Sequence, residues 1–297
     1  MANRELDKLV QRAHALLDRV EALVPGRPVE SDWDSVRAWR WRRDATARWL
    51  DPIAQPDAIE LEALRGIDAQ RERLETNTRQ FLAGLPANNA LLWGSRGTGK
   101  SSLIKALLNR YADDGLRLIE IDKHLLVDLP DVLGQIAARP ERFVVFCDDL
   151  SFEDGDASYK SLKVALDGSL SSSVDNVLVY ATSNRRHLLP EYMDENLLAK
   201  HIDGEVHQGE AVEEKIALSE RFGLWLSFYP FDQDQYLDIA RSWLQRLGVT
   251  NADSEELSRA ALQWALARGS RSGRSAWQFA RHWAGMHALR KQDTGTR

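Results

Sequence analysis

The stretch that decides the fold is Gly94-Ser95-Arg96-Gly97-Thr98-Gly99-Lys100-Ser101. It fits the phosphate-loop pattern G-x-x-x-x-G-K-[ST] at every fixed position. A short apolar strand, residues 90–93, comes directly before it, and a helical stretch over 102–111 follows. Glycines let backbone N–H groups approach phosphate oxygens closely, and the following helix adds its positive N-terminal end. The sequence therefore predicts a phosphate-binding loop between a strand and a helix.

Two side chains of this loop have defined expected roles. Lys100 is placed to reach the β- and γ-phosphates of ATP, and Ser101 to place its hydroxyl on Mg²⁺. The alternative is a glycine-rich turn that contains Lys-Ser by chance, and the flanking strand and helix favour the phosphate loop over it. The candidate nucleotide-binding residues of the loop are Gly94, Ser95, Arg96, Gly97, Thr98, Gly99, Lys100, Ser101 and Ser102.

A second motif, Asp148-Asp149, follows the apolar run 143–147. Such a run is typical of a strand buried on both faces, and open α/β sheets bind ligands at the carboxyl ends of their strands. We therefore expect Asp148 to hold Mg²⁺, through water, and a second carboxylate to orient the attacking water. Alone the pair could be an acidic turn after a core strand. Beside the phosphate loop, the magnesium site is the favoured interpretation.

The chain divides into three predicted regions. Residues 1–56 are expected to form an N-terminal helical extension, with one amphipathic helix over 6–23 and a second running from Ser31 or Asp32 toward Leu50. Residues 57–230 alternate apolar strands with helices, the pattern of a parallel α/β sheet. Residues 231–290 show no strand signal and are predicted to form three helices, followed by a polar, frayed tail over 291–297. The predicted strands are 90–93, 116–121, 143–147, 177–182 and 224–228.

The stretch 33–49 combines tryptophans with arginines and allows two interpretations. Aromatic rings and guanidinium groups together can stack bases and hold phosphates, which would make it a nucleic-acid contact. Tryptophans spaced along a helix more often pack against a neighbouring helix while arginines extend to water. The second interpretation is the better one.

Composition excludes several classes of protein. The 297 residues are 43% hydrophobic and 28% charged, which allows a full core and excludes a largely disordered chain. No apolar run is long enough to span a membrane and the N-terminus has no signal core, so we expect a cytoplasmic protein. The single cysteine, Cys147, excludes an internal disulfide. A net charge of -6 provides no global attraction to nucleic acid or membrane.

With both motifs in hand, the chain resembles the AAA+ ATPases over about 57–290. The tract 180–186, Tyr-Ala-Thr-Ser-Asn-Arg-Arg, looks like the family's sensor 1. By that resemblance Asn184 contacts the γ-phosphate or the attacking water. The resemblance also implies a P-loop NTPase parallel sheet with strand order 5-1-4-3-2, and a C-terminal helical lid over 231–290.

Three further segments are similar to landmarks of the same family. Arg221, in Glu220-Arg221-Phe222-Gly223, matches the arginine finger that reaches into a neighbouring subunit's nucleotide. The tract 269–276 looks like sensor 2, with Arg274 the first choice and Arg271 the second. Gly66 and Ile67 resemble the segment that contacts adenine, although an ordinary turn before a helix over 70–84 is nearly as good a reading.

The resemblance is closer to an uncharacterised bacterial branch of AAA+ proteins, a domain family of unknown function. The stretches that carry it are 77–84 (NTRQFLAG), 86–89 (PANN), 147–153 (CDDLSFE), 182–188 (TSNRRHL) and the Asp-rich 231–236. This resemblance supplies no cellular role.

One departure from the family concerns the acidic pair. Most AAA+ proteins carry Asp-Glu there, whereas this chain has Asp148-Asp149. Asp149 is the positional match for the base that activates water, and Glu153 is the substitute with the longer reach. This departure bears on the rate of hydrolysis and not on ATP binding.

The resemblance implies an ATP hydrolase that uses ATP and Mg²⁺ to remodel or load a protein or nucleic-acid client. It implies a homo-oligomer in which Arg221 acts in trans. The alternative is a nucleotide-dependent switch or scaffold that binds ATP with little hydrolysis.

Overall fold

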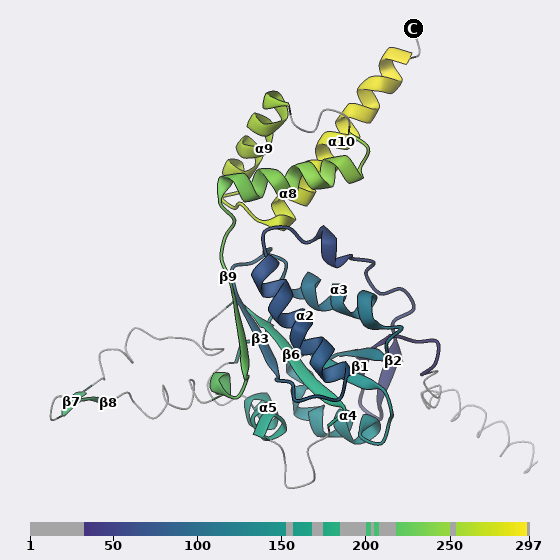
Figure 1. The fold of residues 1–297 in the computed structure, drawn as a ribbon, viewed down its shortest axis with the longest axis vertical. Coiled ribbons are helices and arrows are strands. Elements are labelled where there is room, and N and C mark those ends of the chain that lie inside the picture. The colour runs from purple at the N-terminus through teal and green to yellow at the C-terminus, as the bar shows by residue number, and fades with distance from the viewer. Residues whose placement is uncertain are drawn as a thin grey trace, which may run out of the picture.

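A seven-stranded sheet with helices on both faces forms the body of the protein, and three helices lie at one end of it (Figure 1). This is a computed structural model. It describes residues 33–152, 157–167, 175–184, 200–202, 205–207, 218–249 and 254–295.

The strand order across the sheet is β2-β1-β4-β5-β6-β3-β9. Every neighbouring pair is parallel except β1 and β2, which form an antiparallel hairpin. A separate antiparallel pair joins β7 and β8. The strands are β1 (Ala38–Arg43), β2 (Arg48–Pro52), β3 (Ala90–Gly94), β4 (Leu116–Glu120), β5 (Arg142–Cys147), β6 (Val177–Ser183), β7 (Lys200–Ile202), β8 (Glu205–His207) and β9 (Leu224–Phe228).

Successive residues of the central strands point to opposite faces of the sheet and pack under different helices. Leu92 belongs to the core beneath α2 (Asp68–Leu82) and α3 (Lys100–Tyr111), whereas Leu91 belongs to the core beneath α4 (Leu129–Ile136) and α5 (Ala157–Asp167). Residues 143–147 of β5 are therefore apolar and buried on both faces, as the sequence predicted. Two short 3-10 helices, η1 (Leu61–Ala63) and η2 (Lys123–Asp128), complete this part of the chain.

All five predicted strands are present, but the predicted sheet of five strands is wrong because the sheet has seven. The five keep the relative order 5-1-4-3-2, and the β1–β2 hairpin adds two strands beside β4. The observed order of the complete sheet therefore differs from the predicted one.

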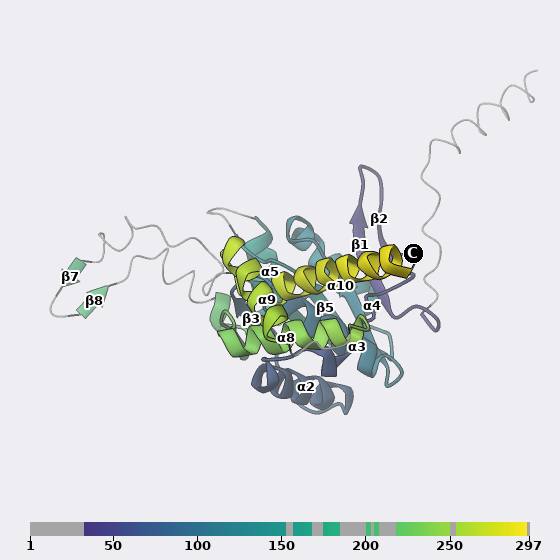
Figure 2. The same cartoon turned by 90° about the horizontal axis from the view of Figure 1, so that it is seen from above.

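The extra strands correct the prediction of a helix from residue 32 toward residue 50. Trp39 and Trp41 alternate with Arg40 and Arg42, a two-residue period that buries both tryptophans on one face of a strand. Asp44 accepts backbone N–H bonds from Thr46 and Ala47, both at 2.7 Å, and closes the hairpin turn. The tip of this hairpin extends past the helices in the view from above (Figure 2).

The N-terminal domain boundary is corrected for the same reason. Residues 38–52 belong to the sheet, so a helical extension over 1–56 is wrong for this part. The predicted helix over 6–23 lies outside the described residues.

The Trp/Arg stretch buries tryptophans as the packing interpretation expected, but in strands rather than in a helix packed on another helix. Trp39 and Trp41 are buried, and the neighbouring arginines pair with acids of the same chain. Arg40 pairs with Glu120 at 2.8 Å, and Arg48 with Asp131 at 2.8 Å.

Three helices form the C-terminal unit, as predicted. They are α8 (Gln233–Arg246), α9 (Glu255–Ala267) and α10 (Gly273–Gly295). Asp232 and Gln235 form a capping box that starts α8. The last helix runs to Gly295, which corrects the predicted frayed tail from residue 291. No helix within the described ranges is long and apolar enough to cross a membrane.

Candidate nucleotide-binding site

The loop between β3 and α3 is shaped by close backbone contacts. Gly94 has a φ of 128°, and a Cβ there would lie 2.0 Å from the carbonyl oxygen of Phe228 on the neighbouring strand. Ser95 donates its backbone N–H to that same oxygen at 2.9 Å. Only glycine fits at the first position of the loop, because β9 approaches it so closely.

Lys100 is buried at the first turn of α3 and bonded to its own loop. Its Nζ donates to the carbonyl oxygens of Gly94 at 2.8 Å and Ser95 at 2.7 Å, and lies 3.4 Å from Asn184 Oδ1. Burial lowers the pKa of the ammonium to about 8, while Asp148 and Asp149 raise it. A phosphate bound here would stabilise the charged form.

Ser101 and Asp148 meet as predicted. Ser101 Oγ donates to Asp148 Oδ1 at 2.6 Å, which brings the phosphate loop against the end of β5. A hydroxyl and a carboxylate at this distance are hard oxygen ligands, and Mg²⁺ is usually held by one or two such groups together with substrate phosphates. The residues present therefore fit a nucleotide-bound Mg²⁺. Among the described residues, no group of three or more His, Cys, Asp or Glu side chains could hold a metal.

Asp149 and Asn184 face one another at the carboxyl ends of β5 and β6. Asn184 Nδ2 donates to Asp149 Oδ1. Asp149 has a φ of 52°, the left-handed conformation that non-glycine residues rarely adopt. Glu153, the other candidate for activating water, lies outside the described residues.

A cavity of about 870 Å³ opens in front of these groups. The carboxyl ends of the strands, the phosphate loop, the segment before α2 and the C-terminal helices all line it. Ile67 lines it as predicted, and Gly66 lies beside it, where an added Cβ would be 3.1 Å from Phe231. Within the loop, the residues from Arg96 to Ser102 line the cavity, whereas Gly94 and Ser95 support it from behind.

The start of α10 docks directly on the phosphate loop. Gly273 donates its N–H to the carbonyl oxygen of Gly97 at 2.8 Å. Arg274 lines the cavity, whereas Arg271 is not among the lining residues. Of the two sensor-2 candidates, Arg274 is the one in position to approach a nucleotide.

Arg221 is a predicted site residue that does not line this cavity. It precedes β9, whose first residue, Leu224, pairs with Ala90 at the start of β3. The phosphate loop begins at the other end of these two strands, and five strand residues span about 17 Å. Arg221 is therefore separated from the phosphate loop of its own chain.

Several residues that line the cavity were not predicted, among them Thr182, Trp243 and Trp277. Thr182 is buried and contacts both aspartates of the acidic pair. Its signal in the sequence was a polar residue inside an apolar strand. Trp243 and Trp277, with ring centroids 4.5 Å apart, line the cavity from the helical unit. No spacing within their helices marks them, because both reach the cavity only through the docking of that unit.

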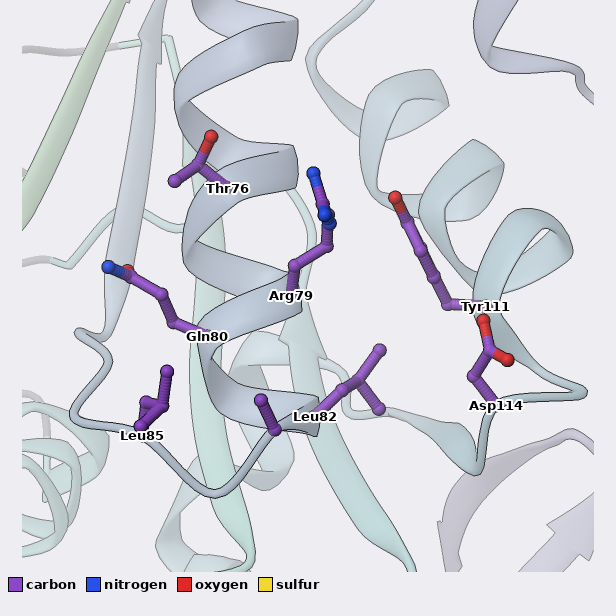
Figure 3. Close-up of a pocket in the computed structure, with 8 residues that line it drawn as sticks. Thr76, Arg79, Gln80, Leu82, Leu85, Tyr111 and Asp114 are labelled. Atoms are coloured by element: carbon purple, nitrogen blue, oxygen red, sulfur yellow. The ribbon is translucent and has the colours of Figure 1, made fainter.

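A second hollow of about 540 Å³ lies at the C-terminal ends of α2 and α3 (Figure 3). Arg79, Leu82 and Leu85 line it from the α2 side, and Tyr111 and Asp114 from the α3 side. Tyr111 donates to Glu75 at 2.6 Å, and burial raises its pKa to about 12. Since α3 begins at Lys100, this hollow is about 16 Å along the helix from the phosphate loop.

Solved structures with the same fold were found. The chain is similar to the Thermotoga maritima RuvB Holliday junction branch migration motor, with 14% identity and a TM-score of 0.54 over 78% of this chain and 66% of that one. It is similar to the Aeropyrum pernix Orc1 protein in complex with DNA, with 14% identity and a TM-score of 0.54 over 79% of this chain and 63% of that one. It spans just under two thirds of the length of each. At this identity the likeness shows the fold alone.

The fold is therefore that of these solved structures, with a phosphate-loop motif between β3 and α3. Residues 34–287 match the model of a family described as "Protein of unknown function (DUF815)", and the chain belongs to that family. The predicted membership of a domain family of unknown function is confirmed. No curated protein matches the sequence.

Proposed function

We propose that this protein binds ATP with Mg²⁺ and hydrolyses it to drive remodelling or loading of a protein or nucleic-acid client. The observation that carries the proposal is the contact of Ser101 Oγ with Asp148 Oδ1 at 2.6 Å. It brings the metal-binding hydroxyl of a phosphate loop to the carboxylate of a buried strand, in a cavity large enough for a nucleotide.

The residues around this contact have complementary roles in the proposed reaction. Lys100 releases the two loop carbonyls it contacts and binds the β- and γ-phosphates. Asp149 accepts a proton from the attacking water, and Asn184, bonded to Asp149, orients that water or the γ-phosphate. Bound Mg²⁺, held by Ser101 and through water by Asp148, would neutralise negative charge that develops on the phosphates.

Two features support the other nucleotide contacts. Ile67, Trp243 and Trp277 offer apolar and aromatic surface in the same cavity, suitable for the base. Arg274 enters from the helical lid, at the point where α10 meets the loop, and is the proposed sensor 2.

Catalysis in an oligomer is part of the proposal. Arg221 lies near the end of β9 that is far from its own phosphate loop, a position that suits a role at the site of a neighbouring copy. A guanidinium supplied in this way stabilises charge in the transition state. A homo-oligomer is the assembly that provides such a neighbour.

The client class stays open between protein and nucleic acid. The two solved relatives are a Holliday junction motor and a protein in complex with DNA, which makes nucleic acid one class to test. The β1–β2 hairpin gives it little support, since Trp39 and Trp41 are buried and Arg40 and Arg48 are paired with acids.

A nucleotide-dependent switch is the second candidate, favoured by one observation. The shorter Asp149 stands where most AAA+ proteins have glutamate, and its carboxylate is bonded to Asn184. A carboxylate that is bonded to Asn184 is held away from the position of the attacking water. Such a protein would bind ATP and change partners with little hydrolysis.

Single-turnover hydrolysis measured at increasing protein concentration separates the two candidates. If an arginine is supplied by a neighbouring copy, the rate per site rises as the protein assembles, followed in parallel by sedimentation. The Lys100→Ala variant is the control for contaminating activity. A measurable rate that does not depend on concentration contradicts the shared site. Tight ATP binding without hydrolysis at any concentration favours the switch.

A further inference from the structure

Thr182, near the end of β6, makes two hydrogen bonds with its hydroxyl. Oγ1 donates to Asp148 Oδ1 and accepts the backbone N–H of Asp149 at 2.9 Å. A hydroxyl has one proton and two lone pairs, so both bonds can exist at once. The side chain is 1% exposed, and water therefore does not compete for these bonds.

The backbone of Thr182 holds the same turn. Its carbonyl oxygen accepts the N–H of Leu150 at 2.7 Å. Three consecutive residues after β5 are thus bonded to one residue of β6. Asp149 lies in the middle of this turn with a φ of 52°, and a non-glycine residue keeps such a conformation only where its surroundings hold it.

These bonds determine where both carboxylates point. Asp148, fixed on one oxygen by Thr182, presents that oxygen to Ser101 as well. Asp149, with its backbone held by Thr182, directs its carboxylate to Asn184. Residues 182 and 184 are two apart, so their side chains leave the strand on the same face.

We propose that Thr182 is a positioning residue that orients the metal-binding Asp148 and the water-activating Asp149 relative to each other. The inference rests on the proposed nucleotide-dependent function. According to this inference, the buried hydroxyl of Thr182 links the residue that holds Mg²⁺ to the residue that activates water. Loss of the hydroxyl releases Asp148 and frees Asp149 to leave the left-handed conformation.

Thr78 provides a matched control. It is a second buried threonine of the same domain, and its Oγ1 also makes two hydrogen bonds, to the Leu74 carbonyl at 2.8 Å and the Tyr180 hydroxyl at 2.9 Å. It contacts no residue of the acidic pair. Thr78→Val therefore measures what loss of a buried, doubly bonded hydroxyl does to the fold alone.

The test compares Thr182→Val, Thr182→Ser and Thr78→Val in the full chain. Valine keeps the size and loses both bonds, whereas serine keeps the hydroxyl. We measure ATP turnover, ATP affinity without Mg²⁺ and the Mg²⁺ concentration that gives half-maximal effect. Thr182→Val should lower turnover by about 10- to 100-fold and raise the Mg²⁺ requirement, as expected for a residue that orients ligands. Its Mg²⁺-free ATP affinity should stay within about threefold of wild type, since Thr182 contacts no phosphate-loop residue.

Two results would overturn the inference. One is turnover and Mg²⁺ requirement in Thr182→Val that match those of Thr78→Val. The other is an equal defect in Thr182→Ser, which would assign the effect to packing of the methyl group. A wild-type protein that binds ATP but does not hydrolyse it refutes the proposed hydrolase alone. In that case the readout is the increase in ATP affinity that Mg²⁺ produces. If this increase is lost in Thr182→Val and restored in Thr182→Ser, the inference is supported. If Thr182→Val shows the same increase as wild type, the inference is overturned. A wild-type protein that binds no ATP refutes both.

Discussion

Gly273, at the first position of α10, donates its backbone N–H to the carbonyl oxygen of Gly97 in the phosphate loop, at 2.8 Å. An added Cβ on Gly97 would lie 3.0 Å from both Cβ and Oγ of Ser272, so the contact extends to side chains. The helical lid is therefore joined to the loop at the point where phosphates would bind. Changes at this contact should affect nucleotide binding as well as stability.

We expect Gly97→Ala to weaken ATP binding through the lid. Gly97 has a φ of 73°, and Gly248, at the end of α8, has a φ of 74° with no atom within 4 Å of an added Cβ. Both alanine variants should lose about 1–2 kcal/mol of unfolding free energy from the left-handed backbone. Only Gly97→Ala should also displace Ser272 and lower ATP affinity, by roughly tenfold for each 1.4 kcal/mol of lost contact. Isothermal titration and thermal unfolding of both variants test this. Equal ATP affinity in the two would contradict the lid contact.

The lowered pKa of Lys100 predicts how ATP affinity depends on pH. Phosphates favour the charged ammonium, so binding raises a pKa that is about 8 in the free protein. Below pH 8 the lysine is charged before and after binding, and its contribution to affinity is constant. Above pH 8 binding must take up a proton, and affinity falls by up to about tenfold per pH unit.

Titrations between pH 7.5 and 9.5 check this, with Lys100→Arg as the variant that does not titrate there. The pH dependence should be lost in Lys100→Arg, and an equal slope in both proteins would refute the assignment. Without ATP the sign is reversed. Between pH 8 and the ordinary value of 10.5 the unfolded chain binds the extra proton, so this group makes stability rise with pH.

Asp149→Asn tests whether this carboxylate activates water. The change removes the charge and keeps the size, so ATP should still bind while turnover falls by about 100-fold or more. Glu153→Gln is the matched change at the other candidate, which the structure does not describe. The variant with the larger loss identifies the base. Unchanged turnover in both would remove the catalytic assignment and favour the switch.

The β1–β2 hairpin offers a test of the fold. Asp128 is 3% exposed, accepts from Trp41 Nε1 at 3.3 Å and pairs with Arg43 at 3.2 Å and Arg48 at 3.3 Å. Its replacement by alanine should cost about 2 kcal/mol of unfolding free energy, because the buried Trp41 N–H loses its acceptor. Asp131 also pairs with Arg48 but is half exposed, and Asp131→Ala should cost less than about 1 kcal/mol. Chemical unfolding of both variants measures the difference, and equal losses would contradict the burial argument.

The sequence predicted the residues at the phosphate-loop end of the sheet but missed the β1–β2 hairpin at its edge. Both outcomes have physical reasons. The phosphate loop, Ser101 and Asp148 could be predicted because each sits at a fixed offset from a strand or helix. The hairpin was missed because Trp39 and Trp41 were read as helical, although their alternation with Arg40 and Arg42 has the period of a strand.

Other features depend on how distant segments meet. The sequence ranked Arg274 before Arg271, but it is the docking of α10 on Gly97 that brings Arg274 to the cavity. Thr182 acquires its role only when β6 lies beside β5. Contacts of this kind have no local pattern to reveal them.

The last prediction concerns Arg221 and catalysis shared between copies. Arg221→Ala should leave ATP affinity nearly unchanged, because the residue is far from its own phosphate loop. Turnover should fall by about 10³-fold or more, the contribution of arginine fingers elsewhere.

Lys100→Ala should instead lose most ATP binding while the fold stays intact, since the side chain contacts the loop and Asn184. Mixing the two inactive variants places an intact Arg221 from one copy against an intact loop of the other. Hydrolysis that returns on mixing supports the shared site. If subunits exchange, as followed by fluorescence transfer between labelled copies, and no activity returns at any ratio, Arg221 does not act in trans.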